Sequence, residues 1–280
     1  MTITHRIQQT IQFVVHGFGL ALKHPILFIY PLIFLSIPAI IAISRYFNIP
    51  HMHKPEYAYN LIAHFNAQSL LSILLITAFS IALTFVAASV SIHAFALLTH
   101  RPITVAKTFK KLTIHAPHLI LWGIITTTLV YSGLIILQVL HLQLHEFSWS
   151  TRALKVLHFC TDELWEFITF FMLQIHALEE CGLLESLKRS FLLASRLITQ
   201  VIAIKVGYTL TSYFVLRKTL VPLMSMLERT YNLPDDYTNL LVGNIASILL
   251  MFFFTIYIVF TTKLYYEHVK ELGKIPHHHA

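Results

Sequence analysis

Two charged residues lie inside long apolar stretches and are the first candidates for chemistry. Lys205 lies about eight residues into one such stretch, and Glu166 lies near the outer end of the stretch before it. A charge in hydrocarbon costs several kcal/mol unless it is paired or hydrated, so such residues mark functional sites by default. If the two stretches are antiparallel helices, the helical rise leaves these residues within about 8 Å in depth. Gln174 would then add a third polar side chain to the group formed by Lys205 and Glu166.

The sequence leaves two arrangements of these charges open. In the first, Lys205 snorkels to the cytoplasmic interface and Glu166 reaches the opposite interface, so that neither is buried. In the second, the two residues form a buried pair or line a polar cavity.

Histidine is the other residue type that suggests chemistry. His141 and His145 are one helical turn apart, a spacing that lets two imidazoles share a metal ion. With 18 histidines in 280 residues such a pair arises by chance, so interfacial histidines are the preferred interpretation. The chain has no P-loop, H-E-x-x-H, G-x-S-x-G or C-x-x-C motif, and we expect neither enzyme activity nor a cofactor.

The composition indicates that the elements carrying these residues lie in a membrane. Hydrophobic residues make up 56% of the chain and charged residues only 12%, which leaves too little polar surface to cover a soluble globule. No linker or low-complexity tract divides the chain. We therefore predict one all-α membrane domain over residues 1–276, followed by a tail at 277–280.

Six apolar runs are long enough to cross the hydrocarbon core as helices, which takes roughly 20 residues each. The fourth run is the least regular, because acidic residues lie at its outer end. Small residues in the second run, among them Ser80, Thr84 and Ser91, predict close helix packing. The predicted spans are approximately 25–43, 69–99, 119–140, 164–178, 197–216 and 240–262.

The basic residues predict the orientation of these spans. Twelve of the 20 Lys and Arg residues lie on the side that carries both termini, seven lie on the other side, and Lys205 is inside a span. Basic residues near span ends are retained in the cytoplasm, so both termini are predicted to be cytoplasmic. The net charge of +7 then reflects topology and attraction to anionic lipid headgroups, and gives no reason to expect nucleic acid as a partner.

Amphipathic segments precede the odd-numbered spans on the predicted cytoplasmic side. In the third segment, Leu183, Leu184, Leu187, Phe191 and Ala194 share one helical face opposite the charged residues. Glu185 precedes Lys188 and Arg189 by three and four residues, a spacing that lets these charges pair along the exposed face. Pro117 is expected to end the second segment and begin a new helix direction. The pattern of amphipathic helix, span, span predicts a three-unit repeat, with convergent topology as the alternative. The interfacial candidates are Lys107, Lys110, Lys111, Glu179, Glu180, Glu185, Lys188 and Arg189.

Two motifs carry a family resemblance. The stretch FVVHGFGLALKHPILFIYPL resembles the start of an uncharacterised family of bacterial six-span inner-membrane proteins. The element E-x-x-G-x-x-E-S-L-K-R-S, from Glu179 to Ser190, is similar to one in that family and in the membrane domain attached to some glycerophosphodiester phosphodiesterases. The resemblance implies a bacterial inner-membrane location. It implies no catalytic residue, because the phosphodiesterase domain is absent from this sequence.

Two classes of function are consistent with these observations. The first is a non-enzymatic protein that binds anionic lipid, a second copy of itself or a membrane partner protein through its cytoplasmic amphipathic helices, and so organises the envelope. The second is a small transporter or channel built around Lys205 and Glu166. A transporter needs a polar cavity at mid-membrane, whereas a scaffold is expected to be packed solid there.

Overall fold

The computed structural model describes residues 17–34, 67–101, 103–143, 163–179, 181–214 and 235–272, and the single positions 218, 222 and 226. Every regular element within these ranges is helical, which confirms the all-α class. Three helices are longer than the others: α4 (Ala67–Leu98), α5 (Val105–Gln143) and α11 (Asp235–Glu271). Each contains a stretch apolar enough to cross a membrane: Ile76–Leu98, Val105–Leu129 and Ile248–Glu271.

Two further candidate spans are bent pairs of helices. Residues Gly17–Lys23 meet Pro25–Phe34, which begins with the short 3-10 helix η1 (Pro25–Phe28), at an angle of 85°. Helix α8 (Leu183–Arg196) meets α9 (Ile198–Phe214) at 93°. The first bend lies at His24, whose backbone leaves the helical region (φ −122°, ψ 74°), a region that the following proline disfavours. The described part of the chain therefore holds three to five candidate spans, and the six-span count stays a prediction.

The fourth predicted span, 164–178, is interrupted. Residues 163–169 are helical, a turn follows at Phe170 and Phe171, and α7 (Met172–Glu179) continues from there. The turn frees the backbone N–H of Phe171 from the helical pattern, and this group donates to Ser190 Oγ of α8 at 3.0 Å. A side chain from another helix thus satisfies a buried donor that an unbroken helix would have paired internally.

The sequence predicts that one helix ends at Pro117 and a new direction begins there, but the helix does not end at this residue. Helix α5 runs without interruption from Val105 through Pro117 to Gln143, so the second amphipathic segment and the third span are a single helix. A proline inside a helix removes one backbone hydrogen bond and usually costs about 3 kcal/mol. The many remaining bonds of this 39-residue helix outweigh that loss.

Helix α4 is at the centre of the fold, in contact with α5, α7, α11 and η1. Its small residues make the interhelical contacts that the sequence predicts. Ser80 Oγ donates to Gly123 O at 3.2 Å, and Thr84 Oγ1 donates to Leu119 O at 3.1 Å, both on α5. On the other side, Thr262 Oγ1 of α11 donates to Ser91 Oγ at 3.2 Å.

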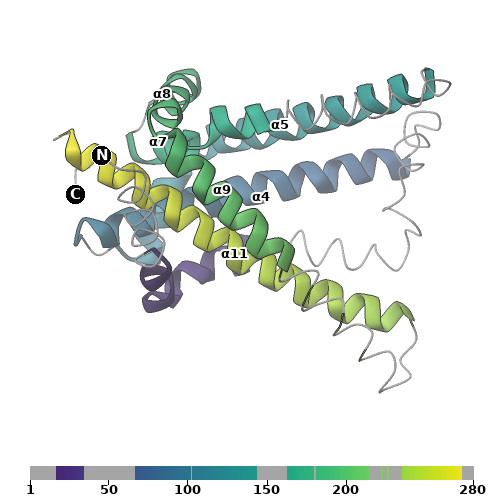
Figure 1. The fold of residues 1–280 in the computed structure, drawn as a ribbon, viewed down its shortest axis with the longest axis horizontal. Coiled ribbons are helices and arrows are strands. Elements are labelled where there is room, and N and C mark those ends of the chain that lie inside the picture. The colour runs from purple at the N-terminus through teal and green to yellow at the C-terminus, as the bar shows by residue number, and fades with distance from the viewer. Residues whose placement is uncertain are drawn as a thin grey trace.

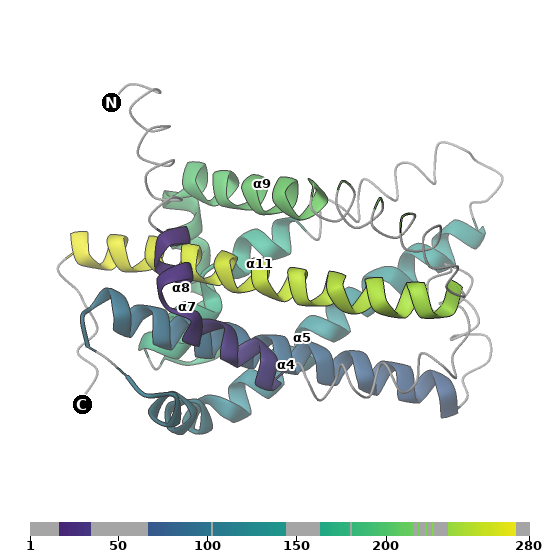
Figure 2. The same cartoon turned by 90° about the horizontal axis from the view of Figure 1, so that it is seen from below.

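The ends of several helices gather at one end of the molecule (Figures 1 and 2). The turn from α4 into α5, the helices α7 and α8, and the C-terminal end of α11 lie at the left in both views, while the start of α4 and the end of α5 lie at the right. The left end carries the segments that the sequence assigns to one membrane side. The functional candidates other than the Lys205 group are concentrated there.

Candidate functional site

The corner between α7 and α8 is built by short-range hydrogen bonds. Cys181 and Gly182 connect the two helices, and Ser186 of the first turn of α8 is fully buried beneath them. Ser186 Oγ donates to the Gly182 carbonyl at 2.9 Å and lies 3.2 Å from Cys181 Sγ. The Ser186 side chain therefore joins the first turn of α8 to the residues that connect α7 and α8.

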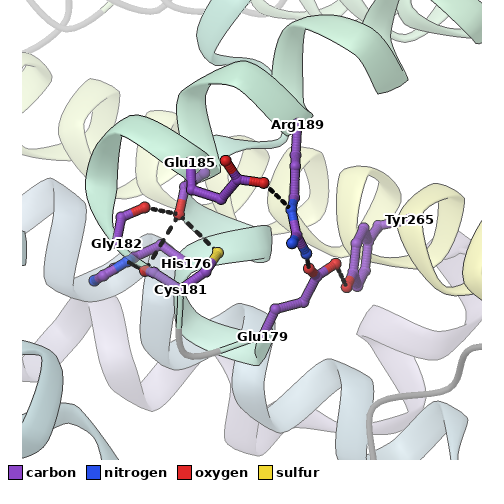
Figure 3. Close-up of polar contacts among 8 residues, drawn as sticks. His176, Glu179, Cys181, Gly182, Glu185, Arg189 and Tyr265 are labelled. Atoms are coloured by element: carbon purple, nitrogen blue, oxygen red, sulfur yellow. Dashed lines mark hydrogen bonds and ion pairs between the residues drawn. The ribbon is translucent and has the colours of Figure 1, made fainter.

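Glu179, the last residue of α7, ties this corner to α11 (Figure 3). Its Oε2 accepts a hydrogen bond from Arg189 Nη1 at 2.5 Å, and its Oε1 accepts one from the Tyr265 hydroxyl at 2.5 Å. Arg189 Nε also donates to Glu185 Oε1 at 2.7 Å, which confirms the pairing predicted from their spacing. A single carboxylate thus connects α7, α8 and α11.

Arg189 lies between two carboxylates, and this shifts the pKa values of Arg189 and Glu185. Its hydrogen bond lowers the pKa of Glu185 below the ordinary value of 4.5. The same bond, together with the one to Glu179, raises the pKa of Arg189. Glu185 is fully exposed, so solvent screens this pair strongly, whereas Glu179 is more sheltered.

His176 is a buried residue of the corner that sequence reasoning missed. Its Nδ1 lies 2.7 Å from the Cys181 carbonyl oxygen, so Nδ1 carries the proton and Nε2 keeps a lone pair. Nε2 is buried and makes no hydrogen bond within the described structure. The rings of His115 and His118 from α5 approach it edge-on, each with 5.1 Å between ring centroids. In the sequence, only the spacing of His115 and His118 could have indicated this group of histidines, because His176 is distant from them in the chain.

Helix α8 presents three different sectors around its axis. Ser186, Ser190, Leu193 and Ala194 face the protein and are buried. Beside them, Leu184 is 84% exposed and Phe191 is also exposed, although the sequence places both on the same apolar face as Ala194, which is buried. The charged residues Glu185, Lys188, Arg189 and Arg196 occupy the remaining side and are exposed. The packed face is therefore rotated toward the serines, and a bare apolar strip separates it from the charges.

The same arrangement occurs at the start of the described chain. Phe18 and Leu22, one helical turn apart on Gly17–Lys23, are both exposed. This short helix also precedes a candidate span through a bend near a right angle. If the following helix crosses a bilayer, each of these two preceding helices lies roughly in the plane of the interface.

Basic side chains around this end are mostly without acidic partners. Arg189 is paired with Glu179 and Glu185, and Lys263 lies 3.6 Å from Glu267. In the part of the chain that the structure describes, no ion pair involves the other basic candidates of this end: Lys107, Lys110, Lys111, Lys188 and Arg196. These residues leave a positively charged surface at the α8 end.

Lys205 and Glu166 are brought together, and a third residue joins them. Lys205 Nζ lies 2.8 Å from Glu166 Oε2 and 2.5 Å from Glu163 Oε2. The lysine side chain is 15% exposed and pairs with Glu166 rather than reaching the interface alone, but the glutamate side chains are 47% and 62% exposed, so the pair is only partly buried. Glu163 was not singled out from the sequence, although its position three residues before Glu166 places both carboxylates on one helical face.

Gln174 belongs to a separate, buried polar contact. Its Nε2 donates to Thr261 Oγ1 of α11 at 2.6 Å, and Thr261 in turn donates to the Ile258 carbonyl at 2.9 Å. Gln174 therefore holds α7 against α11 and makes no contact with Lys205 among the hydrogen bonds of the described residues.

The remaining sequence candidates are not tested by the structure. Glu180 and His145 lie outside the described residues, and only the backbone of His141 is described. Within the described ranges, no group of three His, Cys, Asp or Glu side chains is placed to hold a metal ion.

Comparison with known proteins adds no relative to this geometry. The chain matches no family model, no curated protein and no solved structure. The function must therefore be argued from the site itself.

Proposed function

We propose that this protein is a non-enzymatic integral protein of the bacterial inner membrane that binds anionic lipid through basic amphipathic helices at its cytoplasmic face. By holding such lipids at fixed places it would organise the envelope. The inner-membrane location rests on the resemblance of the two sequence motifs. The lipid surface rests on the geometry of α8, which is the observation that carries the proposal.

The bend between α8 and α9 supports an interfacial position for α8. Helix α9 displays an apolar stripe along its exposed side, formed by Ile198, Ile202, Val206, Leu210 and Phe214, which is suited to lipid tails. With α9 across the bilayer, the 93° bend lays α8 along the interface. Its exposed Leu184 and Phe191 then face the acyl region, and its charged side faces the headgroups, as in interfacial helices generally.

The unpaired basic residues support a preference for anionic headgroups. A Lys or Arg near an anionic membrane surface contributes about 1 kcal/mol of attraction. Lys107, Lys110, Lys111 and Lys188 are exposed or half-exposed and lack ion-pair partners among the described residues. Arg189 differs, because its guanidinium already forms ion pairs with Glu179 and Glu185. We therefore propose that Arg189 holds α8 in place and does not bind lipid.

The proposal includes six spans with both termini in the cytoplasm. The right-angle entry of Gly17–Lys23 and of α8 into the following helix supports a shared unit. In the second unit, the amphipathic segment and the span form one continuous helix, α5, whose first turns point in a different direction from the rest in Figure 2.

Lipid retention tests this function. We expect the purified protein to retain phosphatidylglycerol in preference to phosphatidylethanolamine, measured by native mass spectrometry. Lys188→Gln should lower that preference roughly fivefold, the equivalent of about 1 kcal/mol. Arg189→Gln should change the preference less and lower the thermal stability more. Equal retention of the two lipids by the wild-type protein would refute the proposal.

A second function is favoured by one specific observation. Lys205, which lies in a candidate span, contacts Glu163 and Glu166 near the outer end of the predicted fourth span, and a small transporter or channel would require such a polar group. If Lys205→Leu left both the stability and the cellular phenotype unchanged, this second function would lose its support.

A further inference from the structure

One buried polar atom at the corner between α7 and α8 is not used by the proposed function. His176 is 1% exposed, and its Nδ1 lies 2.7 Å from the Cys181 carbonyl oxygen (Figure 3). Its Nε2 is buried as well and makes no hydrogen bond within the described structure. A buried polar group without a partner costs about 1–3 kcal/mol, and in a native structure such a group calls for an explanation.

A proton is the ligand that suits this atom. In a neutral imidazole whose Nδ1 donates a hydrogen bond, Nε2 keeps a lone pair that accepts a proton. A larger ligand cannot reach the atom while it is buried. Within the described ranges, no three side chains of His, Cys, Asp or Glu are placed to hold a metal ion.

The neighbours of His176 disfavour a positive charge on its ring in this structure. The rings of His115 and His118, both from α5, lie edge-on to it with 5.1 Å between ring centroids in each pair. These two rings become cations in the same pH range as an ordinary imidazole. A charge on His176 would therefore be buried beside like charges, and its new Nε2–H would have no acceptor.

The other titratable groups around the corner are engaged with one another. Glu179, at the end of α7, accepts hydrogen bonds from Arg189 of α8 and Tyr265 of α11. On α4, the buried His93 is hydrogen-bonded to Tyr30. Histidine is the only side chain whose ordinary pKa lies between about 5 and 8, so a mild change of pH acts on the histidines first.

The contact that His176 makes with Cys181 also helps to hold α8. The Cys181 thiol lies 3.2 Å from Ser186 Oγ, and this serine donates to the Gly182 carbonyl at 2.9 Å. If His176 turned toward water, its contact with the Cys181 carbonyl would break and the connection to α8 would loosen. Water is available on the side of His118, which is exposed and directly precedes the third predicted span.

We propose that His176 is a proton-binding residue that makes the corner between α7 and α8 sensitive to cytoplasmic pH. A proton bound at Nε2 favours an open form, in which the ring leaves Cys181 and reaches water, because the closed form binds that proton less well. Where α8 binds lipid as proposed above, the opening would regulate that binding. The proton site itself does not depend on lipid.

The reactivity of Cys181, which is half-buried in the closed corner, measures the opening. In full-length protein carrying Cys160→Ser, its rate of reaction with 4,4′-dithiodipyridine is divided by the rate for the same protein in denaturant at the same pH. This ratio removes the titration of the thiol itself. One proton bound with an ordinary imidazole pKa should raise the ratio about tenfold between about pH 7.5 and about pH 5.5. A ratio that stays constant or falls over this range would overturn the proposal.

Neutral variants separate proton binding from a structural role. In His176→Asn, the side-chain amide can still donate to the Cys181 carbonyl but takes up no proton in this range, so the ratio should stay low at both pH values. His118→Asn should reduce the rise without abolishing it, because one of the two rings that disfavour the charge is gone. A full rise in His176→Asn would contradict the inference. If that variant is open at every pH, an undiminished rise in His118→Asn would contradict it instead.

Two controls test whether other groups cause the rise. His100 is exposed in the turn between α4 and α5 and has a φ of 54°, which asparagine tolerates, so His100→Asn should leave the rise unchanged. Glu180 lies outside the described residues, and Glu180→Gln should likewise keep the rise, since the ordinary pKa of a carboxyl is below this range. Loss of the rise in either control would assign it to that residue and overturn the proposal. None of these results bears on the lipid preference of α8, which is measured separately.

Discussion

At the residue scale, a few polar side chains form hydrogen bonds with backbone groups at the places where helices are interrupted. Ser190 accepts the Phe171 N–H at the break before α7, and Cys181 O accepts from His176 at the break after it. Phe171, Ser190 and His176 are buried, so leaving one of their polar groups without a partner would cost the full desolvation of that group. The corner is therefore a hydrogen-bonded structure in which single substitutions have measurable effects.

Replacing Ser190 tests this directly. Ser190→Ala leaves the Phe171 N–H buried without an acceptor and should lower the free energy of unfolding by about 1–3 kcal/mol. The measurement is thermal unfolding in detergent, followed by tryptophan fluorescence. Ser195→Ala is the control, because Ser195 Oγ is exposed and donates only to the Phe191 carbonyl of its own helix. Equal effects of the two variants would contradict the assigned role.

The pair of Glu185 and Arg189 predicts a dependence on pH. The pKa of Glu185 is lowered in the folded protein, so the pair stabilises α8 above the ordinary carboxyl pKa of 4.5, and this contribution is lost as the pH falls through the lower folded value. The small difference in unfolding temperature between wild type and Glu185→Gln at neutral pH should shrink as the pH falls below 4.5 and disappear below the lowered pKa of the folded protein.

The control for this effect is the background in which Arg189 is already absent. In Arg189→Gln protein, the further change Glu185→Gln should have no pH-dependent effect. A difference that persists there would show that Glu185 acts through another group.

At the scale of elements, close approach of backbones decides how α4 and α5 pack. A Cβ atom at Gly123 would lie 2.7 Å from Ile81 Cγ1 and 2.8 Å from Ile81 Cα. The second of these atoms belongs to the backbone of α4, so a side-chain rotation cannot relieve the contact. Close contact through small residues is the usual way in which membrane helices associate.

Gly123→Ala should therefore force α4 and α5 apart and lower the free energy of unfolding by about 1–3 kcal/mol. Gly207→Ala on α9 is the matched control, because a Cβ there meets no atom within 4 Å. That control should be neutral or stabilising by up to about 1 kcal/mol, since alanine favours helix over glycine. Thermal unfolding of the two variants in the same detergent distinguishes these outcomes.

At the scale of the whole molecule, the basic helices and the ends of the long helices collect at one end. The left end in Figures 1 and 2 holds the start of α5, with its three lysines, and all of α8. A membrane protein with this distribution is expected to keep that end in the cytoplasm.

Labelling of single cysteines checks this orientation. In a background without Cys160 and Cys181, Lys110→Cys and Lys188→Cys should react with a membrane-impermeant thiol reagent only from the cytoplasmic side. Arg152→Cys, on the predicted outer side, should react only from the periplasm. Labelling of residues 110 and 188 from opposite sides would refute the proposed topology.

The sequence alone predicted the features that depend on the order of residues along one helix. Apolar runs long enough to cross a bilayer predicted an all-helical membrane class, and the spacing of Glu185 and Arg189 predicted their ion pair. The spacing of small residues in α4 predicted its close packing. These features are local, because a helix brings residues three or four apart onto the same face.

Only the tertiary structure decided which distant residues meet. Glu163 joins Lys205, Tyr265 donates to Glu179, and Ser190 accepts from Phe171, in each case across two different helices. The continuity of α5 through Pro117 and the rotation of α8 toward its buried serines were likewise not predictable from helical periodicity. The physical reason is that an apolar sector can pack equally well on protein or on lipid, so the choice between them depends on the shape and the free hydrogen-bonding groups of the neighbouring helices.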